Sequence, residues 1–275
     1  MAQVLRSTDD AALVPGRVLR VYGMRRSGNH ALIDWIMRNT SGGGLFLNNC
    51  KPGRDPLETT RAVTAYRDGA QLDMPGREAR IAAAGDAPTA LVSYEDRMPP
   101  LERKPLYAAP ETCVIIYRSF LHWAASLLRK IQGNPGYGPV DRMRVMMNAV
   151  NTYGTMLERV QDGDVVPLLY DRWNTEDSYR AEMAARLDLP GRDLSKGRVQ
   201  SYGGGSSFQG KSVAPETLTT DQRAAQMADD LEYQLILWTA ARDPHFIARL
   251  AEVFPEDALR LSDLLRTAKA EVTLT

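Results

Sequence analysis

The chain has few of the residues that build metal sites and disulfide frameworks. It contains two cysteines, Cys50 and Cys113, and three histidines among 275 residues. Neither cysteine belongs to a pair with the spacing of a metal site, so we expect both to be reduced core residues and expect no bound metal. A chain of this length can bury a large core without disulfides.

Long apolar runs and an excess of one charge are also missing. No stretch reaches the roughly 18 apolar residues that cross a membrane, and residues 1–15 carry Asp9 and Asp10 where a signal peptide would be apolar. With 34 basic and 34 acidic residues, the chain has no global field that would attract nucleic acid or an anionic membrane. These features predict a soluble, cytoplasmic protein without a nucleic-acid partner, in which any anion is bound by a local site.

What the sequence does contain is a glycine-bearing turn between a short strand and a helix. The apolar run 18–21 precedes residues 22–30 (YGMRRSGNH), and apolar residues at helical spacing follow them. The first amides of a helix have no intrahelical partner, and the helix dipole places partial positive charge there. Arg25 and Arg26 add fixed charge, and Ser27 and Asn29 add hydrogen-bond donors. The turn therefore predicts a phosphate-binding loop.

Two families of phosphate-binding loop fit this spacing. Gly23 and Gly28 keep the glycine spacing of a Walker loop, but Asn29 and His30 stand where an ATP-binding loop has Lys and Ser/Thr. The triplet 26–28 (RSG) resembles instead the 5′-phosphosulfate loop of sulfotransferases that use 3′-phosphoadenylyl sulfate (PAPS). A divergent P-loop kinase or NTPase that uses ATP and Mg²⁺ is the alternative. The resemblance implies that the donor is contacted by Gly23, Arg25, Arg26, Ser27, Gly28, Asn29 and His30.

A second motif follows the apolar run 113–117, which is typical of a buried parallel strand. Arg118 comes directly after this run, and Ser126 lies eight residues later, about two turns into a predicted helix. The pair resembles the 3′-phosphate motif of PAPS sulfotransferases, in which an Arg and a Ser bind the 3′-phosphate of the donor. The order of the two motifs also matches that family, so the resemblance implies PAPS as the donor and PAP as a product.

Two carboxylates end another predicted strand, residues 90–94. Ligands of open parallel sheets bind at the carboxyl ends of the strands, so Glu95 or Asp96 would face the ligand. Sulfuryl transfer needs a base for the proton of the acceptor, and the resemblance implies a base at this strand end. We expect Glu95 to be that base, with Asp96 and His30 as alternatives, and Arg26 to stabilise charge on the leaving phosphate.

A glycine-rich segment, residues 196–211, is the last with a predicted role. Its main-chain amides can wrap an anion, and the resemblance implies that a late loop of this kind closes the donor site. Arg198, Gly204 and Gly205 are then expected at the 3′-phosphate, and Phe208 either stacks on the adenine or anchors the loop. A flexible linker is the alternative.

The elements together predict a three-layer α/β sandwich with a roughly five-stranded parallel sheet. The resemblance implies that this sandwich is of the P-loop nucleoside-kinase and sulfotransferase type. We expect one domain over residues 1–275, with the motifs in 17–225 and helices in 226–275. Residues 51–89, predicted as an insertion with short helices, and residues 131–140 would shape the pocket of a small-molecule or carbohydrate acceptor. A protein that binds PAP without turnover is a further alternative.

Overall fold

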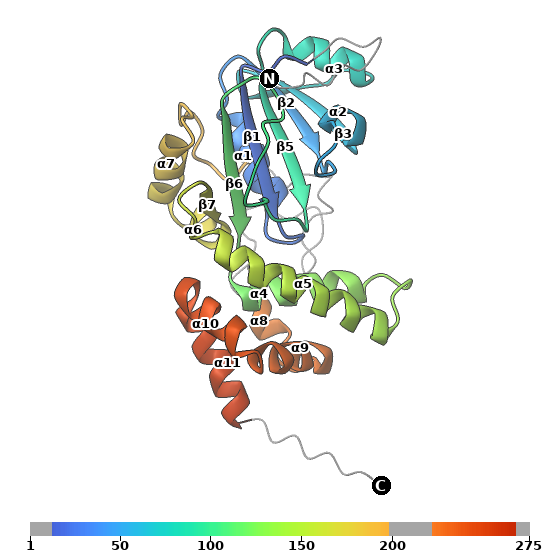
Figure 1. The fold of residues 1–275 in the computed structure, drawn as a ribbon, viewed down its shortest axis with the longest axis vertical. Coiled ribbons are helices and arrows are strands. Elements are labelled where there is room, and N and C mark those ends of the chain that lie inside the picture. Colours follow the sequence, from blue (N-terminus) through green and yellow to red (C-terminus); the bar gives the residue numbers. More distant parts are fainter. Residues whose placement is uncertain (1–12, 198–221, 268–275) are drawn as a thin grey trace. The chain divides into compact units, whose positions relative to one another are not determined.

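The computed structural model describes residues 13–197 and 222–267 of the chain, which form two compact units. Unit 1 consists of the described residues within 1–117 and 159–218, and unit 2 of those within 118–158 and 219–275. Figure 1 shows that the sheet belongs to unit 1, whereas the described part of unit 2 is helical.

Unit 1 is built on a seven-stranded mixed sheet with the strand order β4-β3-β2-β5-β1-β6-β7. The four pairs β2–β5, β5–β1, β1–β6 and β6–β7 are parallel, and the pairs β2–β3 and β3–β4 are antiparallel. The α/β prediction is confirmed. The prediction of a parallel sheet of about five strands is wrong for the sheet as a whole, because the antiparallel strands β3 and β4 extend the five parallel strands to a mixed sheet of seven. The strands are β1 (Arg17–Gly23), β2 (Gly43–Asn48), β3 (Ala62–Arg67), β4 (Ala70–Leu72), β5 (Thr89–Glu95), β6 (Glu111–Tyr117) and β7 (Val166–Leu169).

The two strands that were not predicted, β3 and β4, form a hairpin within residues 51–89. Asp68 and Gly69 make its two-residue turn, with φ values of 47° and 81°, and an Asp-Gly pair is a known hairpin signal. The short helices α2 (Pro56–Thr59) and α3 (Arg77–Ala84) flank the hairpin, as the composition suggested. The apolar alternation of β3 is brief. Val63 and Ala65 are buried, but the residues at both ends of the strand are exposed.

The apolar core of unit 1 lies between one face of the sheet and three helices, namely α1 (Asn29–Arg38), α6 (Tyr170–Thr175) and α7 (Asp177–Arg186). Helix α1 presents its apolar residues at helical spacing, and Trp35 on it meets Trp173 of α6 edge to face, with ring centroids 6.4 Å apart. The central strands are continuous buried runs, as parallel strands with both faces covered require. Core residues of these strands include Leu19, Val21, Leu91, Val114, Ile116 and Leu168.

The opposite face of the sheet holds a buried ion pair. Arg20 alternates with the core residues of β1, is 5% exposed, and places its Nε atom 2.6 Å from a carboxylate oxygen of Glu111 in β6. The connection between β5 and β6 covers this face: the carbonyl of Lys104 accepts from Arg20, and the amide of Leu106 donates to Glu111. The ion pair therefore fastens the connection to the sheet.

Unit 2 packs its described helices around an aromatic cluster. Phe120 and Trp123 of α4 contact Tyr153 of α5, with centroid distances of 5.2 and 4.7 Å, and Phe120 also contacts Phe246 of α10. Asp243 begins α10 by accepting hydrogen bonds from two amides of its first turn. The helices are α4 (Phe120–Gln132), α5 (Pro139–Arg159), α8 (Arg223–Gln226), α9 (Leu231–Ala241), α10 (Pro244–Val253) and α11 (Pro255–Thr267).

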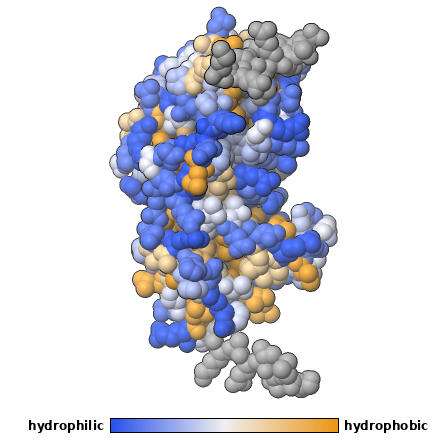
Figure 2. All heavy atoms as spheres, in the orientation of Figure 1, coloured by the Kyte–Doolittle hydropathy of each residue, from blue (hydrophilic) through white to orange (hydrophobic). Residues whose placement is uncertain are grey.

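Several apolar side chains of these helices are exposed, among them Leu231 and Leu235 of α9 and Leu259 of α11. Figure 2 shows the orange, hydrophobic groups of one face of the molecule scattered among hydrophilic ones. Isolated exposed apolar residues are common on protein surfaces. Among residues 13–197 and 222–267, none of the helices combines the length and apolar character that crossing a bilayer requires.

The buried ion pair yields a prediction about stability. Substituting Glu111→Gln leaves the Arg20 guanidinium buried without its counter-charge, which we expect to lower the free energy of unfolding by about 3 kcal/mol. Urea denaturation of the parent and the variant measures the difference. Glu176→Gln is the control, because it breaks an exposed pair with Arg172 and should change stability little. Equal effects of the two substitutions would contradict the prediction.

Candidate functional site

Residues 24–28 connect β1 to α1 in a tight turn at the carboxyl end of the central strand. Arg26 and Gly28 both have positive φ, at 71° and 90°, and the Ser27 amide donates to the Met24 carbonyl at 3.1 Å. Gly28 is the N-cap residue of α1, and its carbonyl accepts from the amide of Ala31 at 3.0 Å. Positive φ is uncommon for a residue with a side chain, so contacts of the folded chain hold Arg26 in this conformation.

The side chain of Asn29 lies across this turn. Its Nδ2 atom donates to the Met24 carbonyl at 3.1 Å, and its buried Oδ1 atom has no hydrogen-bond donor among the described residues. A Cβ atom on Gly23 would come within 2.3 Å of that Oδ1 atom, so only glycine permits the approach. Asn29 therefore stabilises the loop from the position at which an ATP-binding loop presents Lys to the nucleotide.

The turn also leaves polar groups unsatisfied. Ser27 is fully buried, and its hydroxyl has no hydrogen-bond partner within the described part of the chain. Within the same residues, no acceptor is present for the backbone amides of Gly28 and Asn29. Buried polar groups in native proteins are nearly always hydrogen-bonded, and leaving one unpaired costs about 1–3 kcal/mol. These groups are suited to a ligand with several hydrogen-bond acceptors.

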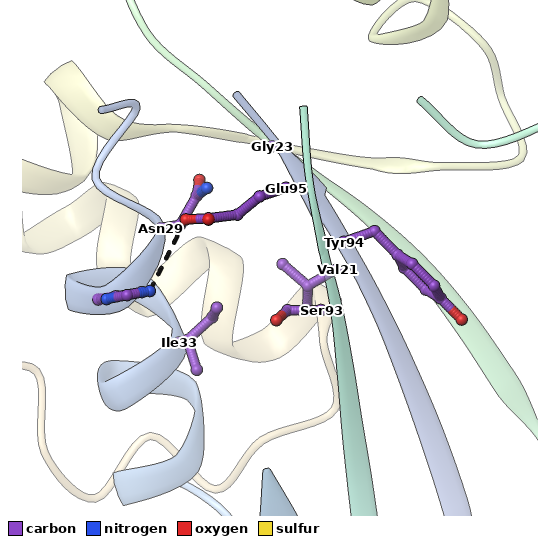
Figure 3. A pocket seen from close by; sticks show the side chains of 8 residues that line it. Val21, Gly23, Asn29, Ile33, Ser93, Tyr94 and Glu95 are labelled. Carbon is purple, nitrogen blue, oxygen red and sulfur yellow. Dashed lines mark ion pairs between the residues drawn. The ribbon is translucent and has the colours of Figure 1, made fainter. Parts of the chain in front are cut away.

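Glu95 lies beside the loop and contacts His30, an interaction drawn as the dashed line in Figure 3. The register of β1 and β5 places Glu95 alongside Gly23, and the Nε2 atom of His30 lies 3.8 Å from Oε1 of Glu95. Asn49, which follows β2, donates to the other oxygen of Glu95 at 3.4 Å. The structure therefore brings two of the predicted base candidates together in one narrow pocket. The pocket is lined by Val21, Gly23, Asn29, His30, Ile33, Ser93, Tyr94 and Glu95.

Burial changes the protonation of both side chains. It raises the pKa of Glu95, and the charge of Asp96 adds to the rise while nearby arginines oppose it. Burial also lowers the pKa of His30 to about 4, helped by the positive charge of Arg26. At neutral pH His30 is therefore uncharged, and Glu95 is a stronger base than an exposed glutamate.

Asp96, the third base candidate, contacts the loop itself. One of its carboxylate oxygens accepts from the Arg25 amide at 2.8 Å, and the other forms an ion pair with Nε of Arg25. Its own amide donates to the carbonyl of Gly23 at 3.1 Å. Both oxygens of Asp96 are thus engaged by Arg25, whereas Glu95 lies in the pocket.

Unit 2 contains the second predicted motif. Arg118 is 1% exposed, and its carbonyl accepts from the Tyr153 hydroxyl at 2.5 Å. Ser126 of α4 is fully buried, and its hydroxyl accepts from Nη1 of Arg223 at 2.6 Å. Arg223 begins α8, and the amide of Ala224 next to it donates to the ring of His122 in α4 at 3.4 Å. Two buried arginines and a hydroxyl therefore belong to this unit, a set suited to phosphate.

Arg223 is a residue that the sequence motifs did not indicate. Its contact with Ser126 joins positions 97 apart in the chain. The one available signal was a basic residue shortly after the glycine-rich segment, at the start of a predicted helix. Four predicted donor contacts lie outside the described residues, namely Arg198, Gly204, Gly205 and Phe208. The two cysteines are free and buried, as expected.

Comparison with known proteins assigns no family to the chain. A scan against protein-family models and a search of the curated proteins each found no match. The sulfotransferase resemblance therefore depends on the loop residues themselves, and it stays a prediction.

The close contact between Gly28 and α6 yields a prediction. A Cβ atom at Gly28 would lie 2.1 Å from the ring of Tyr170, and the backbone there has φ of 90°. We expect Gly28→Ala to lower the free energy of unfolding by about 2–4 kcal/mol, because it adds overpacking to backbone strain. Gly53→Ala is the matched control, since φ is 72° and no atom lies within 4 Å of its Cβ position. It should cost only about 1 kcal/mol, and equal losses in chemical denaturation would refute the explanation.

The lowered pKa of His30 predicts how stability depends on pH. The folded protein binds a proton at His30 only near pH 4, whereas the unfolded chain binds it near pH 6.5. Stability is therefore lost as the pH falls from 6.5 to 4, by at most about 3 kcal/mol at 1.4 kcal/mol per pKa unit. His30→Gln should remove this loss, so the gap in melting temperature between variant and parent should grow towards pH 4. A pH-independent gap would contradict the assignment.

Proposed function

We propose that the protein transfers a sulfuryl group from PAPS to a hydroxyl or amine of its acceptor and releases PAP. The observation that carries this proposal is the set of unsatisfied groups at residues 27–29, beside the pocket that contains Glu95. A buried hydroxyl and helix N-terminal amides suit the oxygens of a 5′-phosphosulfate. Glu95 suits the base that the acceptor requires.

The chemistry of the loop favours a sulfuryl donor over ATP with Mg²⁺. Asn29 binds the Met24 carbonyl, and His30 is uncharged at neutral pH because its pKa is lowered. Neither residue supplies the cation or the hydroxyl with which an ATP-binding loop holds phosphates and metal. Arg26 stays as the basic residue of the loop, at the position that the sulfotransferase resemblance assigns to the donor contact.

In the proposed reaction the acceptor oxygen or nitrogen attacks sulfur, and the bond from sulfur to the bridging oxygen of the 5′-phosphate breaks. The electron pair of that bond stays on PAP, where Arg26 and the loop amides offset the charge. The acceptor proton passes to Glu95, whose pKa is raised. Because His30 is uncharged and 3.8 Å away, it does not reduce the basicity of this carboxylate. Transfer through a loose, in-line transition state depends mainly on positioning and charge stabilisation.

The 3′-phosphate of the donor is assigned to Arg118, Ser126 and Arg223. Each is buried within unit 2, and the guanidinium group offers a planar set of donors that suits phosphate oxygens. Ser126 accepts a hydrogen bond from Arg223, so its hydroxyl hydrogen is left to donate to a phosphate. A preference for PAP over AMP would report this site, because AMP lacks the 3′-phosphate.

Thermal stabilisation by nucleotides tests the proposal. We expect PAP to raise the melting temperature by several degrees at saturating concentration, and AMP to raise it less, since a ligand of the native state shifts unfolding by mass action. Arg118→Ala should abolish most of the difference between PAP and AMP. Arg129→Ala is the control and should preserve it, because Arg129 is an exposed arginine on α4, the helix that carries Ser126. Stabilisation by ATP with Mg²⁺ and none by PAP would reject the proposal in favour of a kinase or NTPase.

A further inference from the structure

We infer that Asp96 is a positioning residue, which holds the phosphate loop in its anion-binding conformation and does not act as the base. The inference concerns the loop of the proposed donor site, so its consequence for PAP binding rests on the proposed function. The claim that Asp96 stabilises the conformation of residues 23–30 does not depend on which donor binds.

Three contacts join Asp96 to the loop. The two carboxylate oxygens bind the amide and Nε of Arg25, and the Asp96 amide donates to the Gly23 carbonyl. These bonds fasten the end of β5 to Gly23, the last residue of β1, and to Arg25 in the turn. Asp96 adopts φ of 53°, a left-handed conformation that aspartate tolerates better than most residues. Asp96 thus combines a left-handed backbone with contacts to the loop through both its amide and its carboxylate.

The same contacts give the two arginines of the loop, Arg25 and Arg26, different roles. Because the Arg25 amide donates to Asp96, the amides that can serve an anion begin after Arg25. The ion pair also neutralises Asp96, whose charge would otherwise repel a phosphate bound close by. Arg25 is thus the counter-charge of Asp96, and the proposed donor contact is assigned to Arg26.

Glu95 and Asp96 are neighbours in sequence, but their surroundings differ. Glu95 faces the pocket and His30, and its closest amide donor is Asn49 at 3.4 Å. Both oxygens of Asp96 accept hydrogen bonds from Arg25, one of them from a charged group. To accept the proton of an acceptor, Asp96 would have to release the loop that it holds. Glu95 needs no such rearrangement.

The turn between β3 and β4 supplies a matched control. Asp68 has φ of 47°, its carboxylate accepts from the Gly42 amide at 2.9 Å, and its amide donates to the Gly42 carbonyl at 2.8 Å. The backbone conformation and the hydrogen bonds resemble those of Asp96, but the residue bound, Gly42, lies in the connection between α1 and β2. Asp68→Asn therefore disturbs the same kind of contact away from the loop.

The test uses Asp96→Asn, Asp68→Asn and Glu95→Gln in the full chain, with amide hydrogen exchange and PAP titration calorimetry. Asparagine tolerates positive φ and keeps one acceptor oxygen, so the variants are expected to fold. We expect Asp96→Asn to speed exchange within residues 23–30 and to weaken PAP binding about tenfold, as the loss of a charged hydrogen bond would. Affinity for adenosine 3′-phosphate, which lacks the 5′-phosphate, should not change. Asp68→Asn and Glu95→Gln should leave exchange of the loop at the parent rate.

Two results would overturn the inference. The first is parent-like loop exchange and PAP affinity in Asp96→Asn. The second is an equal loss of affinity for PAP and adenosine 3′-phosphate, because that pattern indicates a general loss of structure. If the parent does not bind PAP, the proposed function fails, whereas the exchange comparison still decides whether Asp96 holds the loop.

Discussion

Parallel pairing of β1 with β5 on one side and β6 on the other is the constraint on which unit 1 depends. It aligns Gly23, the last residue of β1, with Glu95 and with Ile116 near the end of β6. Three strand ends therefore meet at one edge of the sheet, where ligands of α/β folds bind. The loop, the base candidate and the residue that holds the loop all follow from this register.

Close backbone approach shapes the loop as much as charge does. Because Gly23 has no side chain, the side chain of Asn29 can pack against its backbone. In the same way, the ring of Tyr170 from α6 packs against Gly28. In the same loop Arg26 has positive φ, and the Ser27 hydroxyl is buried without a partner in the described chain. The folded structure thus keeps polar groups unsatisfied at the start of α1, a cost that a bound anion would offset.

Local electrostatics replace the net charge that the chain lacks. Burial makes Glu95 more basic and keeps His30 uncharged, so one pocket combines a base with a neutral neighbour. Arg25 is bound by Asp96, and in unit 2 Arg223 is bound to Ser126. Specific partners thus position individual arginines in a protein with equal numbers of acidic and basic residues.

The sequence by itself determined the features that arise from neighbouring residues: the strand, turn and helix of residues 17–38, the apolar central strands and the α/β class. Its patterns are local, because apolar spacing and glycine position act within a few residues. The hairpin of β3 and β4 was missed because its apolar alternation is too short to indicate a strand. In the structure, β3 pairs with β2, a contact that the local sequence does not reveal. Only the tertiary structure separated Glu95 from Asp96 and brought Arg223 to Ser126. Those distinctions depend on register, burial and contacts between distant segments, which no local pattern encodes.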